Sequence, residues 1–133
     1  MGIDRTSEED FGMNASEFDK LVVARIGYCH QVLNAKASEY ATSDRLHNFK
    51  VAAALQHIEP ETALLGMWAK HIVSIRDIIE GIEHRGEIPK SALLSEKITD
   101  VINYALLLEG LIEERRAATE DPHDHSKELG ATR

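Results

Sequence analysis

The sequence predicts an all-α protein, built as a four-helix bundle-like domain of long antiparallel helices that associates into oligomers. Apolar residues recur at intervals of three and four along most of the chain, which is the period of an amphipathic helix. Runs that alternate apolar and polar residues are missing, as are Asn-Gly and Asp-Gly hairpin turns. Only three prolines, at positions 60, 89 and 122, interrupt this pattern.

The first helix is expected over residues 16–40, with Ser16 as its N-cap. Residues 1–15 are expected to form a flexible N-terminal segment, because their first ten positions are largely charged and polar. One face of the helix should turn toward a core, and its members are Phe18, Val22, Ile26, Cys29, Leu33, Lys36 and Tyr40.

A shorter second helix is expected over residues 44–57, capped by Thr42 or Ser43. Its inward face consists of Leu46, Phe49, Ala52 and Ala53. The third helix is expected over residues 60–83, because Pro60 suits a first helical turn. Six residues of this third helix follow the helical spacing most closely and are expected to face the core: Leu65, Trp68, Ile72, Ile75, Ile79 and Ile82.

The segment 85–90 contains Gly86 and Pro89 and is expected to connect the third helix to a fourth, which starts at Ser91 or Ser95 and ends near residue 118. Short connections favour antiparallel neighbours, so residues 16–118 should form one helical domain, followed by a disordered tail over 119–133. The fourth helix is apolar nearly all round, more than one bundle core requires. This excess predicts a homo-oligomer through the fourth helix.

Composition excludes several classes of protein. The 133 residues suffice for one domain. With 15 Lys and Arg against 23 Asp and Glu, the net charge is −8 and no stretch is strongly basic, which argues against a nucleic-acid backbone as partner. The longest strongly apolar run, residues 104–108, is far shorter than a membrane span. A single cysteine and a charged beginning favour the cytoplasm.

Three polar residues of the fourth helix, Glu96, Asp100 and Asn103, share one narrow sector next to apolar positions. Buried carboxylates require a cation, hydrogen bonds or a metal. Oxygen ligands at such spacing suit Mg²⁺, whose remaining positions water or phosphate oxygens would complete. The alternative is an ordinary solvated helix face beside Lys97.

A second polar anomaly lies on the third helix, where His71 falls inside the apolar arc and Lys70, Ser74 and Asp77 line its margin. One interpretation is a core histidine whose ring bonds a neighbouring carboxylate or carbonyl. The other pairs His71 with Asp77 or Asp100 across helices, as support for a metal or as a proton carrier.

A third cluster spans the first two helices and consists of Lys36, Tyr40, Arg45 and Asn48. Lys36 can simply bury its stem and expose its amine. Alternatively, Lys36, Arg45 and Lys70 turn toward the carboxylates, and Arg45 lies near a helix N-terminus whose free amides favour anions. Together with a metal-binding acidic face, these cations predict a phosphate pocket.

The segments 36–53, 66–79 and 95–114 contain these residues, and they resemble small phage and prophage proteins of uncharacterised function. Those proteins are similar to the MazG-like all-α nucleoside triphosphate pyrophosphohydrolases and to nucleotide-modification-associated domains of phages. The enzymes hold Mg²⁺ over the nucleotide phosphates with ExxE on one helix and ExxD on the next. Here Asp100 and Asn103 stand at the ExxD positions, and Asp77 is the one acid where the earlier glutamates are expected.

The resemblance implies a protein that handles nucleotide phosphates, possessing the activity of a Mg²⁺-dependent (deoxy)nucleoside triphosphate pyrophosphohydrolase and located in the host cytoplasm if phage-encoded. Asp77, Glu96 and Asp100 would then ligate Mg²⁺, with His71 as a further catalytic residue. The nucleotide would contact Lys36, Tyr40, Arg45, Asn48, Lys70 and Asn103. The alternative is a non-enzymatic phage accessory or assembly module that acts through protein–protein binding.

Overall fold

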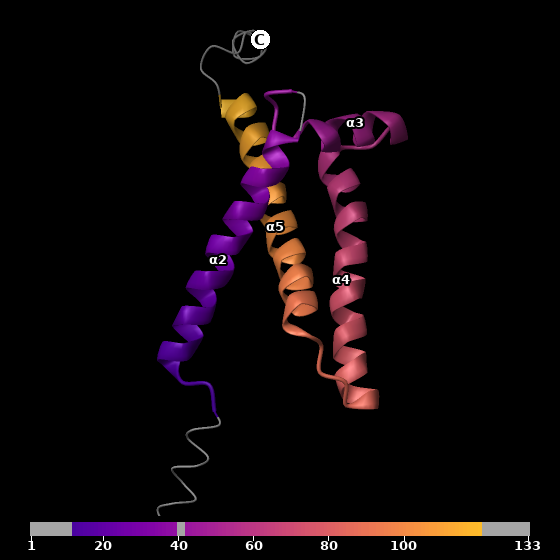
Figure 1. Cartoon of the computed structure of the whole chain (residues 1–133). Coiled ribbons are helices and arrows are strands. Elements are labelled where there is room, and N and C mark those ends of the chain that lie inside the picture. Colours follow the sequence, from indigo (N-terminus) through magenta and orange to yellow (C-terminus); the bar gives the residue numbers. More distant parts are fainter. Residues whose placement is uncertain (1–11, 40–41, 121–133) are drawn as a thin grey trace, which may run out of the picture. The chain divides into compact units, whose positions relative to one another are not determined.

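The computed structural model describes residues 12–39 and 42–120, and all regular structure within them is helical (Figure 1). The described helices are α2 (Ala15–Ser38), α3 (His47–Gln56), α4 (Pro60–Arg85) and α5 (Ser91–Glu120). The chain divides into two compact units after Glu39, so that α2 belongs to the first and the other three helices to the second. The all-α prediction is therefore confirmed.

Helix α2 begins one residue earlier than expected, and its N-cap is Asn14 rather than Ser16. The Asn14 side-chain oxygen accepts a hydrogen bond of 2.9 Å from the backbone N–H of Glu17, which satisfies a free amide of the first turn. Phe18 and Ile26 are exposed, whereas Cys29 is buried as predicted. The expected helix end at Tyr40 lies outside the described residues.

Helix α3 begins at His47, three residues later than expected, because Asp44 forms a turn in front of it. Asp44 Oδ1 accepts a hydrogen bond of 3.0 Å from the N–H of Leu46. The helix ends at Gln56, and its C-cap His57 has a left-handed φ of 58°. Leu46, Phe49 and Ala53 are buried, so the predicted inward face is confirmed at these positions.

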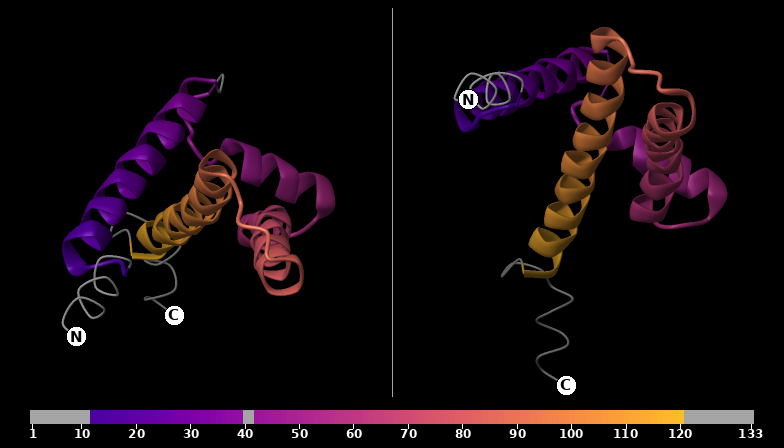
Figure 2. Two further views of the ribbon diagram at one scale, coloured as in Figure 1. Left: turned by 60° about the horizontal axis from the view of Figure 1, so that its bottom comes forward. Right: turned by 90° about the horizontal axis from the view of Figure 1, so that it is seen from below.

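Helices α4 and α5 form an antiparallel hairpin, and α3 lies across the N-terminal end of α4 (Figures 1 and 2). Pro60 opens α4 as expected. Gly86 ends it with a φ of 63°, and the N–H of Glu87 donates to the carbonyl of Gly81 at 3.1 Å. Helix α5 continues through Glu120, so the first two residues of the expected tail are helical; residues 121–133 lie outside the described part.

The core of this second unit lies where α3, α4 and α5 meet. It consists of Leu46, Phe49, Leu64 and Leu111, with Met67, Trp68, Tyr104, Leu107 and Leu108 packed around them. The ring of Phe49 meets Tyr104 edge to face, with ring centroids 6.1 Å apart. Aromatic packing thus joins α3 to α5.

Ion pairs flank this core and connect distant parts of the chain. The Arg115 guanidinium on α5 bonds Glu59 at 3.0 Å and Glu61 at 2.8 Å, and it holds the pKa of Glu61 below its ordinary value. Lys50 on α3 bonds Asp44 at 2.6 Å and Glu114 on α5 at 2.7 Å. These carboxylates raise the pKa of Lys50, and the hydrogen bond from Lys50 lowers the pKa of Asp44.

The expected core face of α4 was wrong at several positions. Leu65, Ile72 and Ile79 are 59 %, 47 % and 57 % exposed, and Ile82 is exposed as well. Trp68 and Ile75 are partly buried, as predicted. The other buried or partly buried residues on this side of α4 are Ala63, Leu64, Met67, His71, Ser74, Ile78 and Gly81. The apolar arc of α4 is wider than the surface that α3 and α5 cover, and its outer edge remains in solvent.

Candidate functional site

His71 and Asp100 meet at the interface of α4 and α5. His71 Nδ1 lies 3.4 Å from Asp100 Oδ2, and both side chains are partly buried. The His71 ring also packs on Tyr104, with ring centroids 4.7 Å apart and planes tilted by 41°. This is one of the two pairings that the sequence suggested for His71. It equally fits a core histidine that a neighbouring carboxylate satisfies.

Further polar side chains on α3, α4 and α5 are buried or have buried polar atoms. Thr99 and Asn103 on α5 are 2 % and 5 % exposed. Asn48 Oδ1 and Trp68 Nε1 are buried, and neither has a hydrogen-bond partner among the residues described. The unit therefore contains a set of buried polar side chains, which can fix the register of the helices through directional contacts.

The structure does not bring the expected Mg²⁺ ligands Asp77, Glu96 and Asp100 together. Asp100 faces His71, whereas Asp77 is exposed on another side of α4 and the Glu96 side chain is 63 % exposed. Residues 71 and 77 are six positions apart, so their side chains leave α4 in directions about 120° apart. Across residues 12–39 and 42–120, no three His, Cys, Asp or Glu side chains are grouped so that they could hold one ion.

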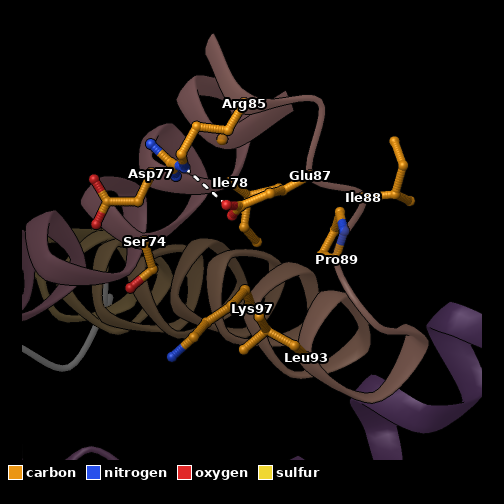
Figure 3. A pocket seen from close by; sticks show the side chains of 10 residues that line it. Ser74, Asp77, Ile78, Arg85, Glu87, Ile88, Pro89, Leu93 and Lys97 are labelled. Carbon is orange, nitrogen blue, oxygen red and sulfur yellow. Dashed lines mark hydrogen bonds and ion pairs between the residues drawn. The ribbon is translucent and has the colours of Figure 1, made fainter. Parts of the chain in front are cut away.

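Asp77 instead lines a hollow of about 330 Å³ at the turn of the hairpin (Figure 3). Its lining residues on α4 are Ser74, Asp77, Ile78, Gly81 and Arg85; those after α4 are Glu87, Ile88, Pro89, Leu93 and Lys97. Arg85 Nε bonds Glu87 Oε1 at 3.0 Å, and a Cβ at Gly81 would lie 3.0 Å from Arg85 Nη2. The hollow thus presents two cations and two carboxylates.

Sequence reasoning missed Arg85 and Lys97 as residues of this hollow. The available signal was the Gly86 turn, because a tight connection brings the end of one helix beside the beginning of the next. Lys97 lies one turn after Leu93 on α5, and both residues line the hollow (Figure 3). Their positions follow from the hairpin and not from any motif.

The expected phosphate-binding residues are distributed over both units. Lys36 is exposed in the unit of α2, and Lys70 is exposed on α4. Arg45 and Asn48 are partly buried before and within α3. Tyr40 lies outside the described residues.

Each helix of the hairpin has an apolar stripe that includes exposed residues. The α4 stripe consists of Leu65, Ile72 and Ile79, each seven positions from the next. The α5 stripe consists of Leu94, Ile98, Val101, Ala105, Leu108 and Ile112, at intervals of four and three. Leu94 and Ile112 are each 41 % exposed, Ala105 is exposed, and the other three are partly buried.

None of the helices that the structure describes combines the length and the apolar character needed to cross a bilayer. Comparisons with protein-family models, with curated proteins and with solved structures found no match for this chain. The resemblance to phage nucleotide-handling proteins stays a prediction.

Proposed function

We propose that the protein is a non-enzymatic helical module that binds helices of other protein chains through the α4 stripe and the α5 stripe. The observation that carries this proposal is the exposure of Leu65, Ile72 and Ile79 on a helix whose other side is packed. A role as a phage accessory or assembly protein fits this mode of action.

The energetics favour a partner for these stripes. Full burial of one Leu or Ile side chain stabilises a complex by about 1.5–3 kcal/mol, and each residue of the α4 stripe has about half of its surface available. Contiguous apolar patches on soluble proteins commonly mark interaction sites. Spacing of seven residues matches the repeat with which one helix packs along another, so the expected partner surface is a helix.

A second candidate function is binding or hydrolysis of a nucleotide phosphate in the hollow at the hairpin turn. Its volume of about 330 Å³ is near the lower end of small-molecule pockets. Lys97 and Arg85 would neutralise phosphate charge there, and Asp77 would contribute one ligand to Mg²⁺. Asp100 and His71 are not among the lining residues, so this candidate has fewer acids than the expected enzyme site.

Photochemical cross-linking in the cells that naturally produce the protein tests the first proposal. A photoreactive amino acid at Ile72 should give discrete covalent adducts with a partner chain. The matched control is Leu55 on α3, which is 77 % exposed but lies outside both stripes. Equal adducts at the two positions, or none at either, would contradict the proposal.

Thermal melting and pyrophosphate release separate the two candidates. The binding module should melt at the same temperature with and without Mg²⁺ and a panel of nucleotides, and it should release no pyrophosphate. A ligand at a hundred times its Kd stabilises a folded protein by about 2.7 kcal/mol, which is readily detected. A raised melting temperature that Asp77→Asn abolishes would replace the first candidate by the second.

A further inference from the structure

The α5 stripe has an internal symmetry. Its six residues follow one another at intervals of four, three, four, three and four, a series that reads the same in both directions. The centre of the series falls at Asn103, which faces the opposite side of the helix and is buried. A helix face that is its own reverse can pair with a second copy of itself.

We propose that this protein forms a two-fold symmetric homodimer in which α5 packs antiparallel on α5 of a second copy. The inference rests on the proposed function and names the partner of the α5 stripe. A two-fold axis at the level of residue 103 places Leu94 against the partner's Ile112 and Ile98 against the partner's Leu108. Val101 then meets the partner's Ala105, and each contact occurs twice, as a self-complementary interface requires.

The sizes of the side chains agree with this pairing. Large Leu and Ile side chains meet each other at both ends of the stripe, and Ala105 meets a mid-sized Val101 near the axis. The two helices can therefore approach closely at the centre while the ends remain filled. Alternating intervals of three and four are the repeat of knobs-into-holes packing between two helices.

The charges beside the stripe are also compatible with a second copy. No charged residue occupies any of the six stripe positions, although each chain has a net charge of −8. Lys97 and Glu109 flank the stripe on opposite sides. The two-fold axis separates each from its equivalent in the partner by twelve residues along the helix, about 18 Å. This exceeds the screening length of about 8 Å at physiological salt, so like charges do not face each other.

Sedimentation equilibrium of the full chain tests the dimer. The molar mass should rise with concentration from 14.8 kDa toward twice that value. Ala105→Asp should hold it at the monomer value, because two carboxylates would be buried beside the axis. Ala105 is exposed in the single chain, so the variant should keep its helical circular dichroism. The control Leu55→Asp should associate like the natural chain.

Disulfide formation between two different variants tests the orientation. Both carry Cys29→Ala; one also carries Val101→Cys and the other Ala105→Cys. Oxidation of the mixture should form disulfides between the two different variants. Two chains of the same variant should not be linked, because their cysteines lie four residues apart along the helix axis. Links within one variant alone would overturn the antiparallel arrangement.

A natural chain that stays monomeric at every concentration, or an Ala105→Asp chain that still associates, would overturn the dimer. The proposed function would survive either result if cross-linking at Ile72 still captured a partner, because Ile72 belongs to the α4 stripe. If cross-links at Ile72 are absent but the α5 dimer still forms, the dimer stands and the proposed binding of partner helices by the α4 stripe is wrong.

Discussion

The two ends of the α4–α5 hairpin differ in how much they bury. At the end where α3 crosses, Phe49 and Leu64 are 1 % and 0 % exposed. At the turn, the small residue Gly81 is buried, and the space beside it is a hollow of about 330 Å³. Two helices can cover only one side of each other, and a third is needed to enclose large side chains. The core of this unit therefore depends on α3.

The ion pairs at the two ends of the hairpin differ in the sequence separation of their partners. Arg115 on α5 bonds Glu59 and Glu61, more than fifty positions earlier in the chain. Arg85 at the turn bonds Glu87, two positions away. Interactions between distant segments hold the α3 end together, whereas those at the turn are local. We expect loss of a side chain to lower the stability more at the first end than at the second.

The largest effect is expected for Phe49→Ala at the α3 end. Removal of a fully buried ring and its edge contact with Tyr104 should lower the free energy of unfolding by about 3–5 kcal/mol, as measured by urea denaturation. Ile88→Ala at the turn, where Ile88 is 77 % exposed, serves as the control and should change it little. Equal losses at both ends would contradict the comparison.

A smaller loss is expected for Gly86→Ala, because Gly86 has a φ of 63°. A left-handed conformation costs a residue with a Cβ about 1–2 kcal/mol, although no atom would obstruct that Cβ. Gly66→Ala is the matched control, since Gly66 lies within α4 with open space around it. That change should stabilise the protein by about 0.5–1 kcal/mol in the same urea experiment. Destabilisation by both changes would argue against this account of the turn.

Acid should weaken the α3 end before the turn. The hydrogen bonds from Lys50 and Arg115 lower the pKa of Asp44 and of Glu61 respectively. Carboxylates with a lowered pKa stabilise the fold above their ordinary pKa of about 4, and this contribution disappears as the pH falls through the lowered value. The melting temperature should thus fall by a few degrees between about pH 5 and pH 2.

Arg115→Gln should make this acid dependence shallower, because Glu61 then loses the cation that lowers its pKa. Arg76→Gln, which removes an exposed pair with Glu80 within one helix, is the control and should leave the pH profile unchanged. If the melting temperature depends on pH identically in the natural chain, Arg115→Gln and Arg76→Gln, the long-range ion pairs do not stabilise the α3 end.

The smallest effect on stability is expected at the α4 stripe. Ile79→Ser removes a side chain that is 57 % exposed, so the free energy of unfolding of the monomer should change by less than about 0.5 kcal/mol. A loss similar to that of Phe49→Ala would mean that Ile79 is covered within the folded chain, and the stripe would then be part of the core.

Much of the fold followed from the sequence. Pro60 marked the start of α4 and Gly86 the connection after it, although α4 continues two residues beyond the expected end at residue 83. The spacing of Leu46, Phe49 and Ala53 identified the buried face of α3. Local chemistry determines these features, since a proline, a glycine and a narrow apolar face each allow few alternatives. The N-cap of α2 was wrong because Asn14 and Ser16 are both good caps, and only the hydrogen bond of Asn14 distinguishes them.

The orientation of α4 could not be predicted in the same way. Its apolar arc is wide enough for either Leu64 and Ile78 or Leu65 and Ile79 to face a neighbour, and the choice depends on where α5 lies. The rotation of α4 about its own axis also decides which polar residues meet α5: it places His71 beside Asp100 and directs Asp77 to the hollow at the turn. Periodicity finds the apolar faces of a helix but does not tell which one the fold covers.

Radical footprinting of the purified chain over a range of concentrations tests most directly whether the stripe on α5 is an interaction surface. If α5 pairs with α5 of a second copy, oxidation of Leu94 and Ile112 should decrease as the concentration rises, while oxidation of Leu55 and Ile88 remains constant. Oxidation of all four side chains that is independent of concentration would contradict it.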